Sequence, residues 1–444
     1  MGPRFREDDG KNQSLCALSG HGATTRYLSV PASGRIRAIM ATNRLFEPCP
    51  IGPIELRNRT IRAAAFEGMC PGQRPSTELL RYHRAVAAGG VGMTTVAYAA
   101  VEQSGLSFAH QLWLRPEVVP DLRALTDAVH AEGAKASIQL GHCGNMAKAA
   151  VAGGRPLAPS ARFNLYGPTW PRAMNAGDLA RVVESFGRAV CLARDAGFDA
   201  VEIHAGHGYL ISQFLSPFTN HRTDAYGGSL ENRLRFLREV MASVRAAARD
   251  DLAVLVKMNL RDGFPGGMEL DDALVVARAL EAAGAHALVL SGGFVSRAPM
   301  YVMRGAMPTR VMAHLMKQAW LAAGVRLFGR WLIAPLPYEE CYFLEDALQV
   351  RKALKMPLIY VGGASSRASI DQVLAHGFEA VAMARALIRD PAFVRRMAEE
   401  EGRTAPCDHC NYCAARIYTT SMACHQVDPP PPDLRRFISA RGVE

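Results

Sequence analysis

Short apolar runs alternate with longer amphipathic stretches along most of the chain, beginning near residue 58. Eight runs are almost continuously apolar, which is typical of parallel strands buried on both faces. They cover residues 60–64, 93–101, 135–140, 200–204, 253–259, 287–291, 358–361 and 380–384. The stretches between them predict helices, among them 178–196, 231–249, 271–283 and 366–375. This alternation predicts an α/β fold with a parallel sheet.

Five junctions between a helix and the following strand share a glycine, as in DAGFDAVEI and AHGFEAVAM. A glycine there supplies the left-handed conformation that ends a helix. The glycines are Gly89, Gly133, Gly197, Gly284 and Gly377, at separations of 44, 64, 87 and 93 residues. The two longest separations are close to twice the first, so we expect each to span two strand–helix units. Eight such units predict a (β/α)8 TIM barrel. The alternative is a doubly wound open sheet, which would usually carry a glycine-rich turn after its first strand.

The predicted barrel is a single domain, residues 43–402, with a segment on either side. Residues 1–40 have no sustained periodicity and are expected to form a disordered leader, with Met40 as an alternative start. Residues 403–444 are expected to form a short C-terminal extension that contains cysteines.

Composition and charge narrow the function classes. The chain has 444 residues, 49% of them hydrophobic and 21% charged, as in ordinary globular proteins. The net charge is +10, but basic residues alternate with acids in stretches such as RLRFLREV, so we expect no nucleic-acid partner. We expect no membrane partner, because no run of eighteen uncharged apolar residues occurs. The N-terminal residues lack a secretory signal, which predicts a cytoplasmic protein.

The fourth predicted strand leads into three side chains that can bind or transfer protons: His204, His207 and Tyr209. In a barrel, the carboxyl ends of the strands carry the chemistry. Two imidazoles can donate hydrogen bonds to one substrate oxygen, and a tyrosine can act as a general acid. The alternatives are histidines that only satisfy backbone groups, or a zinc site in a non-redox metal hydrolase.

Other predicted strand ends carry residues suited to a phosphate-bearing cofactor. Gly362 and Gly363 follow strand seven and would let backbone amides approach a phosphate, while Arg385 follows strand eight. Gln139 lies on strand three, where its amide can bind the edge of a heterocycle. Lys257 on strand five can stabilise negative charge on a reduced ring.

Several blocks together resemble the old yellow enzyme family of FMN-dependent oxidoreductases, particularly its bacterial NADH:flavin oxidoreductase branch. The longest is VEIHAGHGYLISQFLSPFTNHRTDAYGGSLENRLRF; the others are ELRNRTIRAAAFEGM, SIQLGHCG, VKMNLRDGF, YVGGASS and AMARALIRDP. The resemblance covers about residues 43–425. It implies bound FMN, NADH or NADPH as co-substrate, and reduction of the C=C bond of a small α,β-unsaturated carbonyl compound.

The resemblance also implies roles for individual residues. His204 and His207 match the pair that holds the substrate oxygen, and Tyr209 matches the acid that protonates the α-carbon. The matching cofactor residues are Ala63, Ala64 and Ala65 under the flavin, Gln139 and Lys257 at its edge, and Gly362, Gly363 and Arg385 at its phosphate. The first of these segments reads AAAFEG, where many members have an APMT-like sequence.

Four cysteines lie close together in the C-terminal segment: Cys407, Cys410, Cys413 and Cys424. Their spacing suits an iron–sulfur cluster or zinc, and free thiols are the third interpretation. The segment resembles the cluster motif of 2,4-dienoyl-CoA reductase relatives, which implies an iron–sulfur flavoenzyme exchanging electrons with a partner protein as an alternative function. The sequence is compatible with a homo-oligomer.

Overall fold

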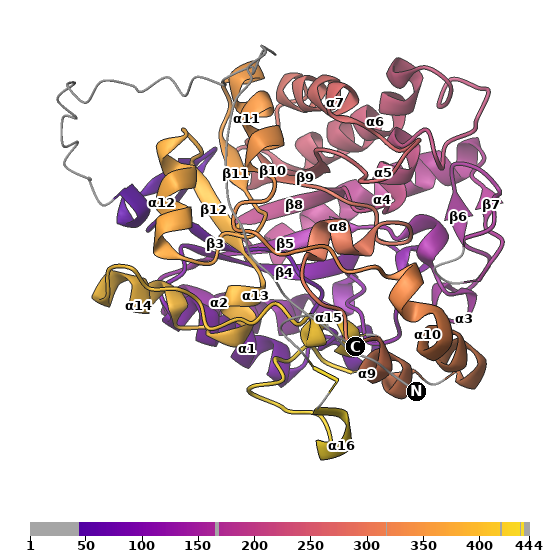
Figure 1. Ribbon diagram of the computed structural model, residues 1–444. Helices are drawn as coiled ribbons and strands as arrows, with labels where there is room; N and C mark the ends of the chain where they lie inside the picture. The colour runs from indigo at the N-terminus through magenta and orange to yellow at the C-terminus, as the bar shows by residue number, and fades with distance from the viewer. Residues whose placement is uncertain (1–43, 165–167, 317, 418–419, 436, 439–444) are drawn as a thin grey trace, which may run out of the picture. The chain divides into compact units, whose positions relative to one another are not determined.

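Eight parallel strands close into a barrel in the order β3–β4–β5–β8–β9–β10–β11–β12, with β12 paired back to β3 (Figure 1). Their bounds are β3 (Thr60–Arg62), β4 (Met93–Ala100), β5 (Lys135–Gly141), β8 (Ala200–Ala205), β9 (Ala253–Asn259), β10 (Ala287–Ser291), β11 (Leu358–Tyr360) and β12 (Ala380–Met383). This computed structural model describes residues 44–164, 168–316, 318–417, 420–435 and 437–438, so the predicted leader lies outside the described residues. The predicted (β/α)8 barrel is confirmed, and each strand ends within two residues of its predicted boundary.

Helices follow the strands and surround the barrel. They are α1 (Thr77–Ala88), α2 (Val119–Ala131), α4 (Ala176–Asp195), α6 (Leu230–Ala248), α7 (Leu270–Ala282), α11 (Leu344–Ala353), α12 (Arg367–Ala375) and, after β12, α13 (Arg385–Arg389) with α14 (Phe393–Glu399). Polar residues fix where several of them begin: the Asn175 side chain accepts from the Asp178 N–H, and Ser366 and Ser369 form a capping box.

The predicted left-handed glycine is present at four of the five helix–strand junctions. Gly133 and Gly197, for example, have φ values of 74° and 80°. The prediction is wrong for Gly89, whose φ is −72°, and the next residue, Gly90, has φ 101° instead. Gly89 is required by close packing, because a Cβ there would lie 1.8 Å from the carbonyl oxygen of Pro391.

A hairpin closes the amino-terminal end of the barrel. Its strands, β1 (Cys49–Ile51) and β2 (Ile54–Leu56), pair antiparallel. Apolar side chains of the hairpin pack in one buried cluster with Met93, Leu255 and Ile359 from the barrel interior. That end is therefore filled with apolar side chains, and the carboxyl ends of the strands are left for polar groups.

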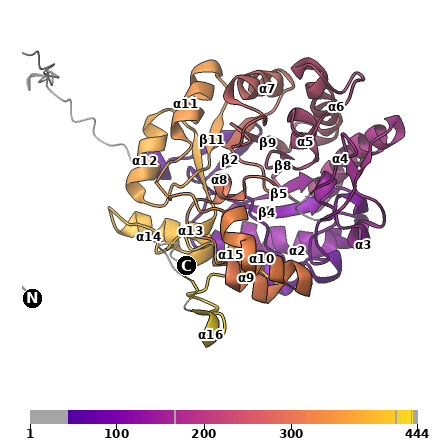
Figure 2. The same ribbon diagram turned by 45° about the vertical axis from the view of Figure 1, so that its right-hand side comes forward.

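Insertions at the carboxyl ends build the rest of the molecule. They contain α3 (Ala149–Ala152), β6 (Leu157–Ala158), β7 (Arg172–Ala173), α5 (Leu210–Leu215), α8 (Pro299–Met303), α9 (Thr309–Leu315) and α10 (Ala319–Leu332). The C-terminal segment adds α15 (Tyr412–Arg416) and α16 (Pro432–Arg435), and α15 lies beside α9 (Figure 2). Short 3-10 helices complete the list: η1 (Arg44–Phe46), η2 (Pro71–Gln73), η3 (Gln103–Gly105), η4 (Pro116–Val118) and η5 (Gly144–Met146). Across the described ranges, no helix is long and apolar enough to cross a membrane.

Candidate active site

The end of β8 brings His204, His207 and Tyr209 together, as predicted. His204 lies on the strand, His207 in the turn that follows, and Tyr209 directly before α5. The His204 ring centre lies 5.1 Å from that of His207 and 4.3 Å from that of Tyr209. The three side chains therefore form one cluster at the barrel mouth.

Two neighbouring strands hold His207 in an unusual backbone conformation. Its φ is 59°, in the left-handed region. Its N–H donates to Oδ1 of Asn259 at 2.9 Å, and its Nε2 lies 2.8 Å from Oγ of Ser291. Its carbonyl oxygen accepts from the Val295 N–H at 3.0 Å. The sequence analysis assigned no role to Ser291. Its position as the last residue of β10 indicated one, because the carboxyl ends of barrel strands carry the chemistry.

Both imidazoles are neutral at neutral pH. Burial, the neighbouring His207 and the Lys257 cation lower the pKa of His204 well below its ordinary value. Burial and Lys257 lower the pKa of His207 to about 3. Nδ1 of His204 is buried and has no hydrogen-bond partner in the part of the chain that the structure describes. A buried polar atom without a partner is costly, so this atom is suited to meet a ligand.

Inside the barrel, Gln139 and Lys257 share a partner that sequence reasoning missed, Glu202. Nζ of Lys257 lies 2.8 Å from Oε1 of Glu202, and Nε2 of Gln139 donates to the same oxygen at 2.7 Å. All three side chains are buried. Glu202 stands two residues before His204 on an apolar strand, so both face the interior, and this alternation was a signal for it.

The turn after β3 places small side chains at the barrel mouth. Ala63 is buried, whereas Ala64 and Ala65 are partly exposed. Beneath them, Nη1 of Arg62 lies 2.6 Å from Oε1 of Glu67, and Nη2 donates to the Ala65 carbonyl at 3.0 Å. This buried ion pair fixes the turn, so its methyl groups form a defined surface.

The Gly362–Gly363 turn leaves its backbone donors available. Among the described residues, neither glycine N–H donates a hydrogen bond to another group. Gly363 has φ 82°, and a Cβ there would lie 2.7 Å from the Tyr342 ring. The Arg385 guanidinium donates elsewhere, to the Arg304 carbonyl at 2.7 Å and to Oδ1 of Asn411 at 2.9 Å. It lines the cysteine pocket.

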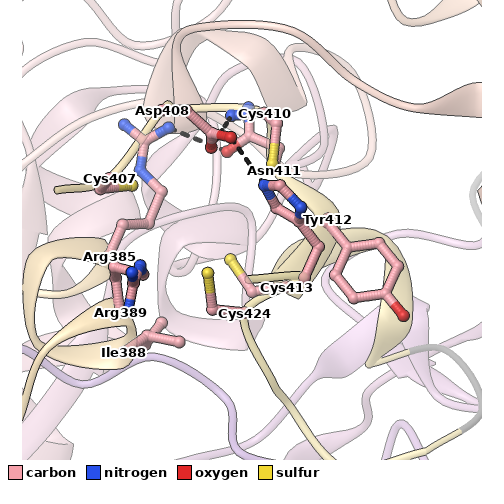
Figure 3. A pocket seen from close by; sticks show the side chains of 11 residues that line it. Arg385, Ile388, Arg389, Cys407, Asp408, Cys410, Asn411, Tyr412, Cys413 and Cys424 are labelled. Carbon is pink, nitrogen blue, oxygen red and sulfur yellow. Dashed lines mark hydrogen bonds and ion pairs between the residues drawn. The ribbon is translucent and has the colours of Figure 1, made fainter. Parts of the chain in front are cut away.

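The four C-terminal cysteines line one small pocket, together with Arg385 and Arg389 (Figure 3). In Figure 3 the sulfurs of Cys413 and Cys424 point into the same space, with Cys407 and Cys410 on either side. Burial raises the pKa of the Cys413 thiol to about 12, so without a metal it stays protonated. The structure thus brings together residues that the sequence could only group by spacing.

A cavity of about 930 Å³ lies above the strand ends. Its lining includes Asn145 from the loop after β5, Phe218 from the loop after β8, and Val295 from the loop after β10. Val295, which lines the cavity, and Tyr209 both pack on one apolar cluster with Tyr98, so the cavity lies beside the cluster that Tyr209 contacts. Its size suits a small organic molecule.

These groups fit the flavin mononucleotide that the sequence implies. The Ala63–65 turn offers small side chains to a ring, and the buried Gln139 and Lys257 offer an amide and a cation to its edge. The unpaired Gly362 and Gly363 donors suit a phosphate. The unpartnered Nδ1 of His204 leaves a polar contact for a substrate.

Comparison with known proteins identifies the family. The model of the NADH:flavin oxidoreductase / NADH oxidase family matches residues 44–326. The chain is 43% identical over 380 residues to the 4,4'-dithiodibutanoate disulfide reductase of Rhodococcus erythropolis, covering 85% of this chain and 94% of that protein. It is 33% identical over 374 residues to the metal reductase of Desulforamulus reducens, covering 83% of this chain and 50% of that protein.

The same fold occurs in the old yellow enzyme homologue of Zymomonas mobilis, with a TM-score of 0.66 and 23% identity. That likeness covers 89% of this chain and 99% of the other. The chain spans about half the length of the metal reductase and most of the disulfide reductase. The chain therefore belongs to the NADH:flavin oxidoreductase / NADH oxidase family and is an FMN-dependent oxidoreductase that uses NADH or NADPH.

Proposed function

We propose that the protein is an ene reductase, which reduces the C=C bond of small α,β-unsaturated carbonyl compounds. The observation that carries the proposal is the buried, unpartnered Nδ1 of His204 beside His207 and Tyr209. Two neutral imidazoles can bind the carbonyl oxygen of such a substrate, and the neighbouring phenol can protonate its α-carbon.

Each of these residues has a distinct task in the reaction. A bound FMN would supply the hydride chemistry that links NAD(P)H to the β-carbon of the substrate. His204 and His207 hold the substrate oxygen and stabilise the negative charge that develops there. Tyr209 donates the proton that the α-carbon needs. Asn259 and Ser291 position His207, and Gln139 and Lys257 would hold the flavin edge.

Replacing Tyr209 by Phe tests the proton-donor role. We expect the oxidation of reduced enzyme by an enone to slow by about 100-fold or more, the usual contribution of a general acid. Reduction of the enzyme by NAD(P)H should stay within about twofold, since that half-reaction needs no proton from Tyr209. Anaerobic stopped-flow absorbance measures both half-reactions separately.

Tyr98→Phe is the matched control. The Tyr98 ring lies 5.0 Å from the Tyr209 ring, but its hydroxyl is 2.9 Å from Oγ of Ser107. This variant should keep both half-reactions near the wild-type rates. Equal losses of both half-reactions in Tyr209→Phe would contradict the proposed role.

An organic disulfide is a second candidate substrate, favoured by the 43% identity to the Rhodococcus reductase. The same hydride source would cleave the S–S bond to two thiols, with one proton taken up. Release of thiols from 4,4'-dithiodibutanoate, coupled to NAD(P)H oxidation and faster than enone reduction, would favour this substrate class.

We further propose that Cys407, Cys410, Cys413 and Cys424 hold an iron–sulfur cluster. Four cysteines line one pocket, and Arg385 and Arg389 add positive charge beside thiolates that a metal would deprotonate. Anaerobically purified protein should contain iron and sulfide, and both should disappear in Cys413→Ser. One equivalent of zinc, or neither metal nor sulfide, would contradict this proposal.

A further inference from the structure

The insertion between β10 and α11 concentrates positive charge. This insertion, residues 292–343, contains six Arg or Lys residues and only two acids, Glu339 and Glu340. Basic residues therefore outnumber acids in this segment, which carries +4 of the chain's net charge of +10. Such a segment attracts an anionic partner.

Helix α10, within this insertion, exposes large apolar side chains. The exposed fractions are 65% for Trp320, 64% for Leu327, 51% for Phe328, 69% for Trp331 and 62% for Leu332. Only Gly329 of this helix is buried. Nowhere else in the described chain does one helix expose so many large apolar residues.

The sequence of α10 separates these side chains from its arginines. At about 100° per residue, Trp320, Leu327 and Trp331 fall along one line, and Phe328 and Leu332 continue the same apolar face. Arg326 and Arg330 fall on the other side, and both are exposed. Neither has an ion-pair partner within the described part of the chain. The helix is thus amphipathic, with tryptophan and leucine on one face and free cations on the other.

Charge and length together identify what this face fits. A helix with tryptophan, phenylalanine and leucine opposite arginine lies in the interface of an anionic membrane. The 14 residues of α10 measure about 21 Å, too short to cross the hydrocarbon core. A second copy docked through the same face would bring its own basic helix, which like-charge repulsion disfavours.

We propose that α10 docks on the surface of anionic lipid membranes. Its apolar face enters the boundary between headgroups and acyl chains, and Arg326 and Arg330 contact lipid phosphates. Trp320, Phe328 and Leu332 also line the 930 Å³ cavity above the strand ends. Docking therefore places one wall of the cavity at the lipid, where apolar substrates are concentrated. The expectation of no membrane partner rested on the absence of a membrane-spanning segment, and docking on the surface needs none. Membrane docking also does not depend on the proposed ene reduction.

Flotation of the FMN-loaded full chain with vesicles tests the proposal. Vesicles of phosphatidylcholine alone are compared with vesicles that contain phosphatidylglycerol. We expect binding to the anionic vesicles, weakened by high salt. Leu327→Ser with Trp331→Ser should weaken binding by about tenfold or more. Arg326→Gln with Arg330→Gln should weaken it by roughly 30-fold.

A matched control separates α10 from exposed tryptophan in general. Trp170 is 61% exposed and lies outside α10, so Trp170→Ser should leave vesicle binding unchanged. Leu327 and Trp331 do not line the cavity, so their variant should keep the wild-type rate of NADPH oxidation without vesicles. Size-exclusion chromatography with light scattering follows the oligomeric state of each variant.

Three results would overturn the proposal. The first is no binding to anionic vesicles, and the second is equal binding by the wild type and the Leu327/Trp331 variant. The third is a wild-type oligomer that dissociates in the Leu327/Trp331 variant, which would assign the face to a contact between copies.

Discussion

Glu202 is a buried anion of the barrel interior, and removing its charge should destabilise the protein. Its carboxylate lies 2.8 Å from Nζ of Lys257, and both side chains are at most 3% exposed. Glu202→Gln keeps the size of the side chain and an oxygen that can accept from Gln139. The change therefore leaves the Lys257 charge buried without its counter-ion, which costs about 3–5 kcal/mol. A protein of this kind has only about 5–15 kcal/mol of stability in total.

Urea unfolding with FMN in large excess, followed by circular dichroism, measures the loss. Adding Lys257→Met to Glu202→Gln removes the unpaired charge and should recover at least about half of it. Glu231→Gln is the control, because Glu231 pairs with Arg238 on the surface, and it should leave the free energy of unfolding nearly unchanged. A loss below about 1 kcal/mol in Glu202→Gln, or no recovery in the double variant, would refute the reasoning.

Two further outcomes follow from the site. The pKa of His207 is lowered to about 3 from 6.5, so the unfolded chain binds a proton there that the folded chain does not. Stability is therefore full above pH 6.5 and falls toward pH 3, by about 1.4 kcal/mol for each pH unit. His207→Asn should flatten this dependence in urea unfolding at pH 7, 6 and 5, and equal slopes would argue against it. Gly363→Ala places a Cβ 2.7 Å from Tyr342, and it should weaken FMN binding at least about tenfold by fluorescence titration. Gly377→Ala is the control, because Gly377 has a similar φ of 87° but lies at the end of a helix. Unchanged FMN affinity in this variant would show that the loss in Gly363→Ala is specific to the glycine turn.

The barrel could be predicted because each strand is continuously apolar and its ends are marked locally. Runs such as 253–259 and 287–291 need no information beyond their own residues, and the structure has the same bounds. The cluster of His204, His207 and Tyr209 could be predicted for the same reason. All three residues lie within six positions of the sequence, at the end of one strand.

Contacts between distant segments could not be predicted in this way. In the sequence, Glu202 is one polar residue on an apolar strand. Only the folded barrel places Gln139 of β5 and Lys257 of β9 beside it. Arg385 has the expected place after β12, but the C-terminal segment supplies Asn411 to its guanidinium. The exposed face of α10 depends on which surfaces the rest of the chain leaves uncovered, and an amphipathic pattern does not specify that.

The central claim is that this FMN enzyme passes its electrons to an activated C=C bond. The most direct measurement is anaerobic: reduce the flavin with one equivalent of NADPH, add one equivalent of 2-cyclohexenone, and record the visible spectrum and the products. The account predicts that the oxidised flavin spectrum returns while one equivalent of cyclohexanone forms. A flavin that stays reduced with the enone, and is reoxidised promptly by an organic disulfide, would contradict it.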